Sequence, residues 1–393
     1  MIQISPETKA FIREHTTDDV RSLALQSKKY PEVDMPMAMI QISGYQIAAE
    51  KLPTWNRTED VWYPRHLSLE QCSSEVTARY KATLVQGDTF TDLTGGFGID
   101  CFILSQSFNI TTYVERQEEL CELAIHNAPL LGVKNICVRN EDAVEYLQNM
   151  QPVDCIFIDP ARRNEYGGKT VVISDCEPDV SNIEELLLEK AKQVLIKLSP
   201  MLDLSLALKE LKHTKEVHIV SVNNECKELL LLLEKGDYQE VSTHCINFTS
   251  KEEQQFTFTL KQEQDSICTY ASDIEQYLYE PNASILKAGA FRSIASVYQL
   301  KKLHPNSHLY TSVELNRQFP GRVFRITGHC SFNKKEIKEV IGDIRKANIT
   351  VRNFPASVAE LRKRMKITDG GDIYLFATTL NNNQKVLIRC EKA

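Results

Sequence analysis

Short apolar segments alternate with helix-like segments between residues 80 and 262, and this alternation limits the possible folds more than any other feature. β-branched and aromatic residues mark the predicted strands, and the segments between them have the apolar spacing that is typical of helices. Strands that alternate with helices form parallel sheets with right-handed crossovers. We therefore predict an α/β fold with a doubly wound sheet. The predicted strands are residues 89–93, 111–115, 135–139, 153–159, 193–199, 216–222, 241–248 and 255–260.

The regions on either side have a different pattern. Residues 1–75 predict short helices, because prolines interrupt a sequence that has few β-branched runs. Residues 271–315 are predicted to be mostly helical. The last part of the chain predicts a small α+β module with an antiparallel or mixed sheet. Its predicted strands are 322–328, 349–354, 372–380 and 384–390, and its predicted helices are 334–347 and 357–367.

Several classes of protein are excluded by what the sequence lacks. The leucine run Leu229–Leu233 is far too short to span a membrane, and we predict that it forms a buried helical segment. The N-terminal residues do not have the order of a signal peptide. The 11 cysteines include no CxxC pair, and His213, His218 and His329 have no ligand-like neighbours in the sequence. We expect a cytoplasmic protein with reduced thiols, no membrane segment and no metal site.

The charge is unevenly distributed. The whole chain has a net charge of −7, but residues 316–393 contain 16 Lys/Arg and 7 Asp/Glu, a net charge of +9. A basic module on an acidic body suggests a polyanionic partner that one end of the chain binds. A charged surface that only keeps the module soluble is the alternative.

The segment DLTGGFGID, residues 92–100, follows the first predicted strand, at the edge of the sheet where α/β proteins bind ligands. Its glycines allow a ligand to approach the backbone closely. The dinucleotide pattern GxGxxG is met only in part, because Cys101 stands in the place of the third glycine. Asp92 would repel a pyrophosphate but attract ammonium and sulfonium charges. The segment therefore favours S-adenosyl-L-methionine over NAD as the cofactor.

Acidic residues also stand at the end of the second predicted strand and just after the third. Glu115 is expected to accept hydrogen bonds from both ribose hydroxyls, and Asp142 to reach the adenine amino group. Acidic residues at strand ends are also common as helix N-caps, but their order after three successive strands favours a nucleoside ligand. The predicted cofactor-binding residues are Asp92, Thr94, Gly95, Gly96, Phe97, Gly98, Glu115, Arg116, Asp142, Ala143 and Asp159.

Six stretches, which together span nearly the whole chain, carry a resemblance to a known family. On these stretches the chain resembles the bacterial class I S-adenosylmethionine-dependent methyltransferases that have a C-terminal THUMP-like domain. The stretches are LSLEQCSSEVTARYKA (67–82), DLTGGFGID (92–100), YVERQEELCELAIHN (113–127), FIDPARR (157–163), YEPNASILKAGA (279–290) and VRNFPASVAELRKRMKITDGGDIYLFATT (351–379).

The resemblance implies a Rossmann-like methyltransferase domain between other parts. In related enzymes the helix before the first strand helps to close the cofactor pocket, which makes Gln71, Ser73 and Ser74 candidates. A polar helix start is an equally good interpretation of these three residues. The implied parts are a helical N-terminal domain (1–75), the methyltransferase domain (76–262), a connector or small ferredoxin-like domain (263–315) and a basic THUMP-like domain (316–393).

The sequence IDPARR begins at the end of the fourth predicted strand, where the acceptor meets the methyl donor in such enzymes. In the amino-methyltransferases that it resembles, this position is Asp/Asn-Pro-Pro-aromatic, and the carboxylate and the following carbonyl hold an exocyclic amine. Asp159 and Pro160 match this pattern and are the predicted catalytic residues. Ala161 and Arg162 depart from it, so the aromatic residue that stacks on the base is missing. Tyr166, or the guanidinium plane of Arg162, is a candidate substitute.

Two further features concern the substrate. Arg162 and Arg163 are placed to contact phosphates, with a loop salt bridge as the alternative. RNA C5-pyrimidine methyltransferases need a cysteine after the fifth strand, but KLSPMLD (197–203) has Ser199 and no thiol, so this chemistry is not expected.

The resemblance implies RNA as the partner, because THUMP-type domains are linked with RNA binding. We predict methylation of RNA, rRNA or tRNA, at a base nitrogen. Two alternatives stay open: a protein or small-molecule acceptor with the C-terminal module as a protein-contact domain, and a binding module without catalysis, against which the intact cofactor motif argues. The predicted RNA-binding residues in the basic module are Arg352, Arg362, Lys363, Arg364 and Lys366.

Overall fold

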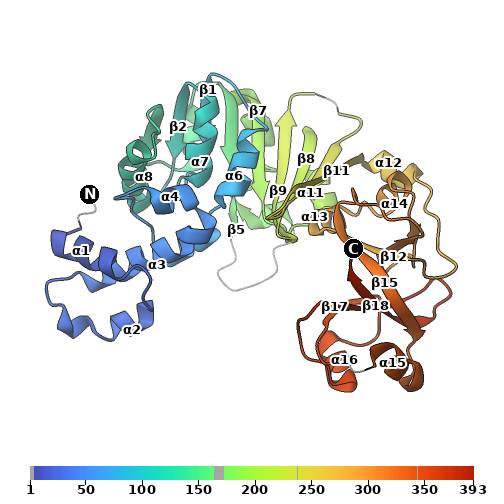
Figure 1. Cartoon of the computed structure of the whole chain (residues 1–393). Helices are drawn as coiled ribbons and strands as arrows, with labels where there is room; N and C mark the ends of the chain where they lie inside the picture. The colour runs from blue at the N-terminus through green and yellow to red at the C-terminus, as the bar shows by residue number, and fades with distance from the viewer. Residues whose placement is uncertain (1–3, 163–171, 237, 343) are drawn as a thin grey trace. The chain divides into compact units, whose positions relative to one another are not determined.

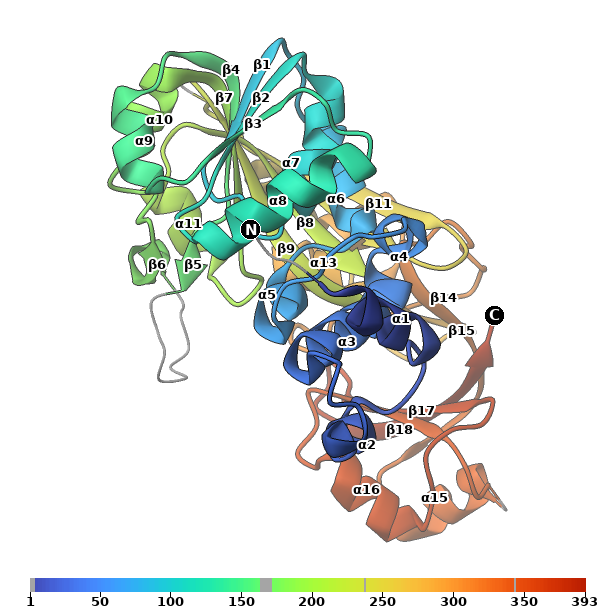
Figure 2. The ribbon, with the colours of Figure 1, turned by 90° about the vertical axis from the view of Figure 1, so that its left-hand side faces the viewer.

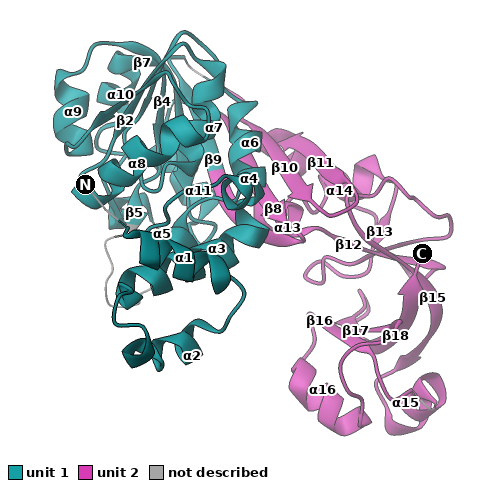
Figure 3. Cartoon of the chain, turned by 60° about the vertical axis from the view of Figure 1, so that its left-hand side comes forward, with its two compact units in different colours: residues 1–215, 230–238 teal, residues 216–229, 239–393 magenta. Residues whose placement is uncertain are grey.

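The structure is a computed structural model, and it describes residues 4–162, 172–236, 238–342 and 344–393 (Figure 1). The chain divides into two compact units (Figure 3). The first unit is Met1–Lys215 with Leu230–Tyr238, and the second is Glu216–Leu229 with Gln239–Ala393. In the part of the chain that is described, no helix has the length and apolar character needed to cross a membrane.

The N-terminal region of the first unit is helical, as predicted. Polar side chains begin several of its helices, because their oxygens accept hydrogen bonds from backbone N–H groups that have no partner within the helix. Pro36 and Pro53 lie in the first turn of a helix, where proline is tolerated. The helices are α1 (Pro6–Glu14), α2 (Val20–Ala24), α3 (Met35–Lys51), α4 (Pro53–Arg57), α5 (His66–Gln71) and α6 (Glu75–Ala82).

Five parallel strands form the centre of the first unit, in the order β7-β4-β1-β2-β3. Helices cover both faces: Figure 2 shows the strands between α9 and α10 on one side and α6, α7 and α8 on the other. The direction of winding reverses at β1, so the loops after β1 and β4 diverge there. The strands are β1 (Thr89–Asp92), β2 (Ile110–Val114), β3 (Ile136–Arg139), β4 (Val153–Ile158) and β7 (Ala191–Leu198). The helices are α7 (Ile99–Leu104), α8 (Glu118–Leu130), α9 (Ala143–Asn149), α10 (Glu184–Lys190) and α11 (Leu204–Glu210).

The larger sheet has nine strands in all, in the order β11-β10-β8-β9-β7-β4-β1-β2-β3. Its remaining members are β8 (Thr214–Val222), β9 (Glu225–Glu234), β10 (Ser242–Phe248) and β11 (Glu253–Thr259), after which the short helix α12 (Leu260–Asp265) follows. β10 pairs with β8 in parallel and with β11 in antiparallel orientation. The sheet therefore combines a parallel centre with a mixed end.

The prediction of a helix at Leu229–Leu233 is wrong, because these residues lie in β9. Asn223 and Asn224, with φ of 49° and 64°, form a two-residue turn between β8 and β9. All five leucines are buried. A strand that is covered on both faces loses the alternation of apolar and polar residues, so its sequence does not differ in pattern from a buried helix.

The second sheet has seven strands, in the order β13-β14-β12-β15-β18-β17-β16, and all of it lies in the second unit. It is mixed, as predicted, because β16 and β17 are parallel and the other neighbouring strands are antiparallel. The strands are β12 (Tyr277–Pro281), β13 (Lys301–Lys302), β14 (Tyr310–Ser312), β15 (Gly321–Ser331), β16 (Asn348–Arg352), β17 (Ile373–Thr379) and β18 (Lys385–Lys392). The helices are α13 (Ala283–Ala288), α14 (Ser293–Val297), α15 (Lys334–Ile341) and α16 (Val358–Met365).

Two predictions for this region are wrong. Residues 271–315 are not mostly helical, because β12, β13 and β14 lie within them, and strands this short carry little periodicity. The helix predicted for residues 334–347 ends at Ile341, because Gly342 follows it with a φ of 55°, a conformation that glycine adopts readily.

Candidate functional site

The glycine-rich turn connects β1 to α7, and each of its glycines meets a steric demand. Gly96 and Gly98 have φ of 54° and 88°. A Cβ atom on Gly95 would lie 2.2 Å from the ring of Tyr113. The Tyr113 hydroxyl in turn donates to the carbonyl of Gly96 at 2.5 Å. The turn is therefore held against β2 in a shape that leaves its backbone accessible from the other side.

Glu115, directly after β2, is bound to this turn. Its Oε2 accepts a hydrogen bond from the backbone N–H of Gly96 at 3.0 Å, and its Oε1 accepts one from the N–H of Gln117 at 2.8 Å. The residue is buried. Each carboxylate oxygen can accept more than one hydrogen bond, so Glu115 keeps acceptor capacity for a ligand while its position is fixed.

Asp92, the last residue of β1, is a buried carboxylate with only one oxygen in use. Its Oδ1 accepts the backbone N–H of Thr94 at 2.9 Å, whereas its Oδ2 is buried without a hydrogen-bond partner among the described residues. Burial raises the pKa of this carboxyl well above its usual value, and the charges of Asp100 and Asp159 raise it further. A buried acceptor without a partner costs free energy, so a cationic ligand beside Asp92 would stabilise the site.

Asp159 follows β4 at the point where the sheet reverses its winding. Its backbone N–H donates to Thr94 Oγ1 at 2.7 Å, which joins the ends of β1 and β4. Its carboxylate forms a very short ion pair with Lys197 of β7. Burial raises the pKa of the Asp159 carboxyl above its usual value, and Lys197 opposes this rise.

Lys197 also connects Asp159 to a second buried carboxylate, Asp100 of α7, from which its Nζ lies 3.6 Å. Lys81 of α6 is fully buried and contacts Asp100 Oδ1 at 2.9 Å, and Ser73 donates to Asp100 Oδ2 at 2.6 Å. Burial acts to raise the pKa of Asp100, but Lys81 and Lys197 hold it below its usual value. Two lysines and two aspartates thus form one charged network beneath the turn.

A cleft of about 540 Å³ opens above the turn, within the first unit. Its far side is formed by the segment after the two-stranded pair of β5 (Ala161–Arg162) and β6 (Cys176–Glu177), including Asp179 and Ile183. Gln71 of α5 lines it as well. The predicted cofactor residues that line the cleft are Thr94, Gly96, Phe97, Glu115, Arg116, Asp142, Ala143 and Asp159.

Other predicted residues have different surroundings. Asp92, Gly95, Gly98 and Pro160 are not among the lining residues. Of the helix candidates, Ser73 and Ser74 do not line the cleft either: Ser73 belongs to the charged network, and Ser74 is the N-cap of α6.

The other residues predicted near the cleft differ in what the structure shows of them. Asp142 is the N-cap of α9, accepting from Val144 N at 2.8 Å through Oδ1, and it lines the cleft as well. Arg116 is exposed and pairs with Glu177 at 3.0 Å. The backbone of Arg162 lies in β5, and Arg163 and Tyr166 lie outside the described residues.

Comparison with known proteins identifies the family. A ferredoxin-like domain model matches residues 277–320, and a THUMP domain-like model matches residues 321–392. The crystal structure of a proposed methyltransferase from Porphyromonas gingivalis W83 is 36% identical, covers 100% of both chains and has a TM-score of 0.89. The chain belongs to this methyltransferase family. The match also confirms the predicted fold class, with its Rossmann-like domain and THUMP-like C-terminal module.

More distant structures resemble parts of this methyltransferase. TrmK of M. capricolum, in complex with S-adenosyl-homocysteine, is 14% identical over 41% of this chain and 69% of its own, with a TM-score of 0.33. An rRNA methylase from Streptococcus thermophilus is 13% identical over 42% of this chain and 98% of its own, with a TM-score of 0.31. Scores this low support no functional inference. Among curated proteins, no sequence matches this methyltransferase.

Three charged residues of the network beneath the turn were missed by sequence analysis: Lys81, Asp100 and Lys197. Lys197 did give a signal, because a lysine within the otherwise apolar strand QVLIKLS needs a buried partner. Lys81 and Asp100 lie in segments with ordinary helical patterns, so only the packing of α6 against α7 shows that they meet.

The basic residues predicted in the THUMP-like module of the methyltransferase fall into two groups. Arg352 contacts Glu280 Oε1 at 2.7 Å, and Arg362 forms an ion pair with Asp369, so both have acidic partners within the protein. Lys363, Arg364 and Lys366 are exposed.

The predicted helix over residues 357–367 would place residues 362 and 366 on one face, and this expectation is wrong because the helix ends at Met365. Lys366 is the C-cap of α16 and has a φ of 56°, so it lies just outside the helix. Arg364, at the end of α16, places its guanidinium 4.5 Å from the centre of the Phe332 ring.

Proposed function

We propose that the cleft binds S-adenosyl-L-methionine and that the chain transfers its methyl group to an RNA base. The observation that carries the cofactor assignment is Asp92, whose Oδ2 is buried without a hydrogen-bond partner among the described residues beneath a glycine turn. This cofactor carries ammonium and sulfonium charges, which suit such a carboxylate, whereas a pyrophosphate would be repelled. Family membership supports the reaction type, since the P. gingivalis relative is a proposed methyltransferase.

The residues of the cleft fit the parts of this cofactor. Glu115 keeps acceptor capacity for the ribose hydroxyls, and Asp142 is the candidate for the adenine amino group. Gly96 presents its backbone without a side chain between it and the ligand. When bound, the cofactor supplies an electrophilic methyl group, and the protein supplies binding, orientation and exclusion of water.

Asp159 is the proposed acceptor-orienting residue. Its carboxylate lines the cleft, and together with the carbonyl of Pro160 it would accept hydrogen bonds from an exocyclic amine. Such an amine would keep its lone pair directed at the methyl group. Lys197 is a positioning residue: it contacts Asp159 and favours its ionised form, in which both oxygens act only as hydrogen-bond acceptors.

RNA, as rRNA or tRNA, is the proposed substrate class. The THUMP-like module carries a net charge of +9 over residues 316–393. Its exposed residues Lys363, Arg364 and Lys366 are free to contact phosphates in a way that Arg352 and Arg362, which pair with carboxylates, are not. A protein or small-molecule acceptor is the competing proposal, and the missing aromatic after Pro160 is the observation that favours it. The four-part division at residues 75, 262 and 315 is likewise a proposal.

The test is a comparison of nucleosides from RNA of a deletion strain and its parent by mass spectrometry. The proposal expects one methylated nucleoside to disappear from the deletion strain. It should return with the parental gene but not with the Asp159→Ala variant, which the purified protein should show to be folded. Unchanged nucleosides, together with methylation of a purified protein by the enzyme, would replace RNA by the competing acceptor.

A further inference from the structure

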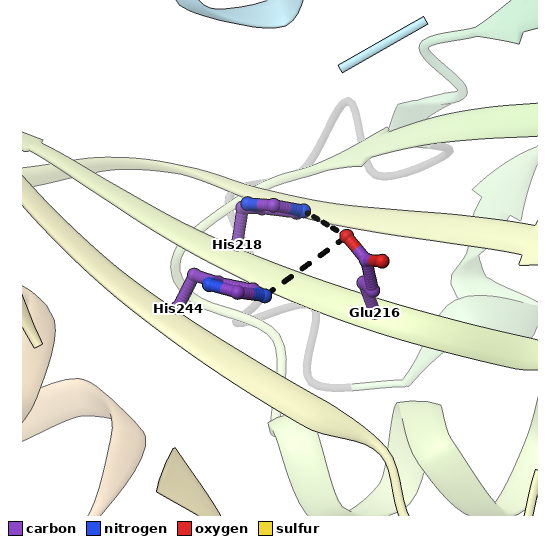
Figure 4. A group of neighbouring side chains, drawn as sticks. All are labelled: Glu216, His218 and His244. Atoms are coloured by element: carbon purple, nitrogen blue, oxygen red, sulfur yellow. Dashed lines mark ion pairs between the residues drawn. The ribbon is translucent and has the colours of Figure 1, made fainter. Parts of the chain in front are cut away.

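A cluster of two histidines and one glutamate lies on the mixed end of the larger sheet, far from the cofactor cleft in the sequence and wholly within the second unit (Figure 4). Glu216 and His218 are two residues apart on β8, so their side chains emerge on the same face. His244 of β10 lies opposite His218 in the parallel register. One ligand atom from each of the three residues lies within 4.8 Å of the others.

The three side chains point their acceptor atoms at one another. The Nε2 of His218 lies 3.3 Å from Glu216 Oε2, and the Nε2 of His244 lies 3.9 Å from the same oxygen. Figure 4 shows both imidazole edges turned toward the carboxylate. A neutral imidazole whose Nε2 carries the proton can donate a hydrogen bond to the carboxylate, whereas an Nε2 that carries the lone pair is repelled by it unless a cation lies between them. Each contact is therefore bridged either by a proton on the histidine or by a metal ion.

The partner of the second His244 nitrogen fits a metal ion. Thr257 lies opposite His244 on β11, and its Oγ1 is 3.0 Å from His244 Nδ1. In the tautomer whose Nδ1–H donates to this hydroxyl, Nε2 carries the lone pair that faces Glu216. Metal-binding histidines are held in this way, with the nitrogen that does not bind the metal donating to an oxygen of a neighbouring residue.

The distances suit a small transition-metal ion. In a tetrahedral zinc site the metal lies about 2.0–2.2 Å from nitrogen and oxygen ligands, so neighbouring ligand atoms are about 3.3–3.5 Å apart. The pair of Glu216 and His218 already has this separation, and the pair of Glu216 and His244 must close by a few tenths of an ångström. The imidazole rings are stacked, with planes 11° apart, so the half-exposed ring of His244 must turn for both lone pairs to converge.

We propose that Glu216, His218 and His244 bind a Zn²⁺-like ion, with water as the fourth ligand. Two imidazoles and one carboxylate suit Zn²⁺ better than Mg²⁺ or Ca²⁺, which prefer oxygen ligands. Glu216 and His244 are both partly exposed, which leaves access for the ion and for water. The ion joins β8 to β10 through their side chains and stabilises this end of the sheet.

The test is a titration of the full-length protein with Zn²⁺ after treatment with a chelator, by calorimetry in the presence of a thiol reductant. One ion per chain is expected to bind, and the unfolding temperature should rise with Zn²⁺ concentration because only the folded state holds the site. His244→Ala and Glu216→Gln should each weaken the affinity about 100-fold or more, and Thr257→Val about 10- to 100-fold. His329→Ala, an exposed strand histidine of the same unit, is the matched control and should bind like the parent.

A second measurement separates this site from the 11 cysteines of the chain. Co²⁺ bound at the cluster should give the visible absorption of a four-coordinate ion without the ultraviolet band of a thiolate ligand, and His244→Ala should abolish it. The proposal is overturned if the parent binds no Zn²⁺, if the variants bind it equally well, or if the Co²⁺ spectrum shows thiolate ligation. Circular dichroism of each variant confirms that a loss of binding is not a loss of folding.

Discussion

The glycine-rich turn after β1 and the basic surface of the THUMP-like module were both predicted from short motifs, but the predicted residues come together only at the turn. The basic surface consists of Arg352, Arg362, Lys363, Arg364 and Lys366. Gly96 and three acidic residues after strands, Glu115, Asp142 and Asp159, meet around one cleft, because parallel strands bring their carboxyl ends to one edge of the sheet. The basic residues of the module instead separate into two with acidic partners and three that are exposed. The positions of residues at strand ends follow from the topology of the sheet. The partner of a charged surface residue depends instead on how neighbouring elements pack.

The largest effect is expected at Asp159. Replacing it by alanine should lower methyl transfer about 10²- to 10³-fold, because the acceptor amine loses its orienting carboxylate. Cofactor affinity should change little, since Asp159 is proposed to contact the acceptor. Single-turnover kinetics and calorimetry measure the two quantities. Glu145→Ala, at an exposed position of α9, is the control, and a parental rate in Asp159→Ala would end its assignment to the acceptor.

Glu115 comes next. A carboxylate that accepts ribose hydroxyls contributes about 1.5–3 kcal/mol, so Glu115→Ala should weaken S-adenosyl-L-methionine binding about 10- to 150-fold. Calorimetry with the cofactor and with NAD tests both the residue and the choice of ligand. Glu118→Ala, an exposed acid in the first turn of α8, should leave the affinity unchanged. Tighter binding of NAD than of S-adenosyl-L-methionine would contradict the assignment of the cleft.

The third prediction concerns Lys197 and the pH dependence of the methyl-transfer rate. Lys197 opposes the burial that raises the pKa of Asp159, so Lys197→Met leaves only the smaller effect of Lys81 against that rise. The ionised form then appears only at higher pH, and the acidic limb of the rate profile should move upward, with about a tenfold loss of rate per unit below it. Lys192→Met is the matched control, because this exposed lysine of the same strand pairs with Asp154. A limb that stays in place would show that Lys197 has only a structural role.

The smallest effect is expected on the basic surface. Replacing Lys363 and Arg364 by glutamine and Lys366 by asparagine, which tolerates a positive φ, should reduce the salt dependence of RNA binding. The slope should flatten by about 0.7 for each phosphate that the variant no longer neutralises, and thus by about 2 in all. Binding to RNA between about 50 and 200 mM salt gives this slope. A parental slope in the triple variant would place the RNA elsewhere.

Arg352→Ala tests the difference between the basic residues that pair with carboxylates and those that are exposed. It leaves the buried Glu280 with Arg322 as its remaining arginine partner in the described structure, so stability should fall by about 1–3 kcal/mol while the salt slope is preserved. Denaturant unfolding measures the first quantity and the same RNA titration the second. A flattened slope without loss of stability would move Arg352 to the RNA-binding group.

The sequence by itself determined which segments form the central strands and where the glycine-rich turn lies between them. Segment 92–100 follows a predicted strand, and the sheet topology then requires Glu115 and Asp159 to lie near it. The same local patterns failed at Leu229–Leu233 and in residues 271–315. Burial on both faces removes the alternation from the first, and the strands of the second are too short to show a period.

Only the tertiary structure brought together groups that are distant along the chain. Lys81, Asp100 and Lys197 come from three segments and meet beneath the turn, where burial forces opposite charges to pair. His218 was judged to have no ligand-like neighbours, and it acquires His244 through the pairing of β8 with β10. Spacing in a sequence indicates contacts within one helix or strand. Contacts between elements depend on how the strands are ordered in the sheet. The charged network and the proposed metal site join residues of different elements, so only the tertiary structure could show them.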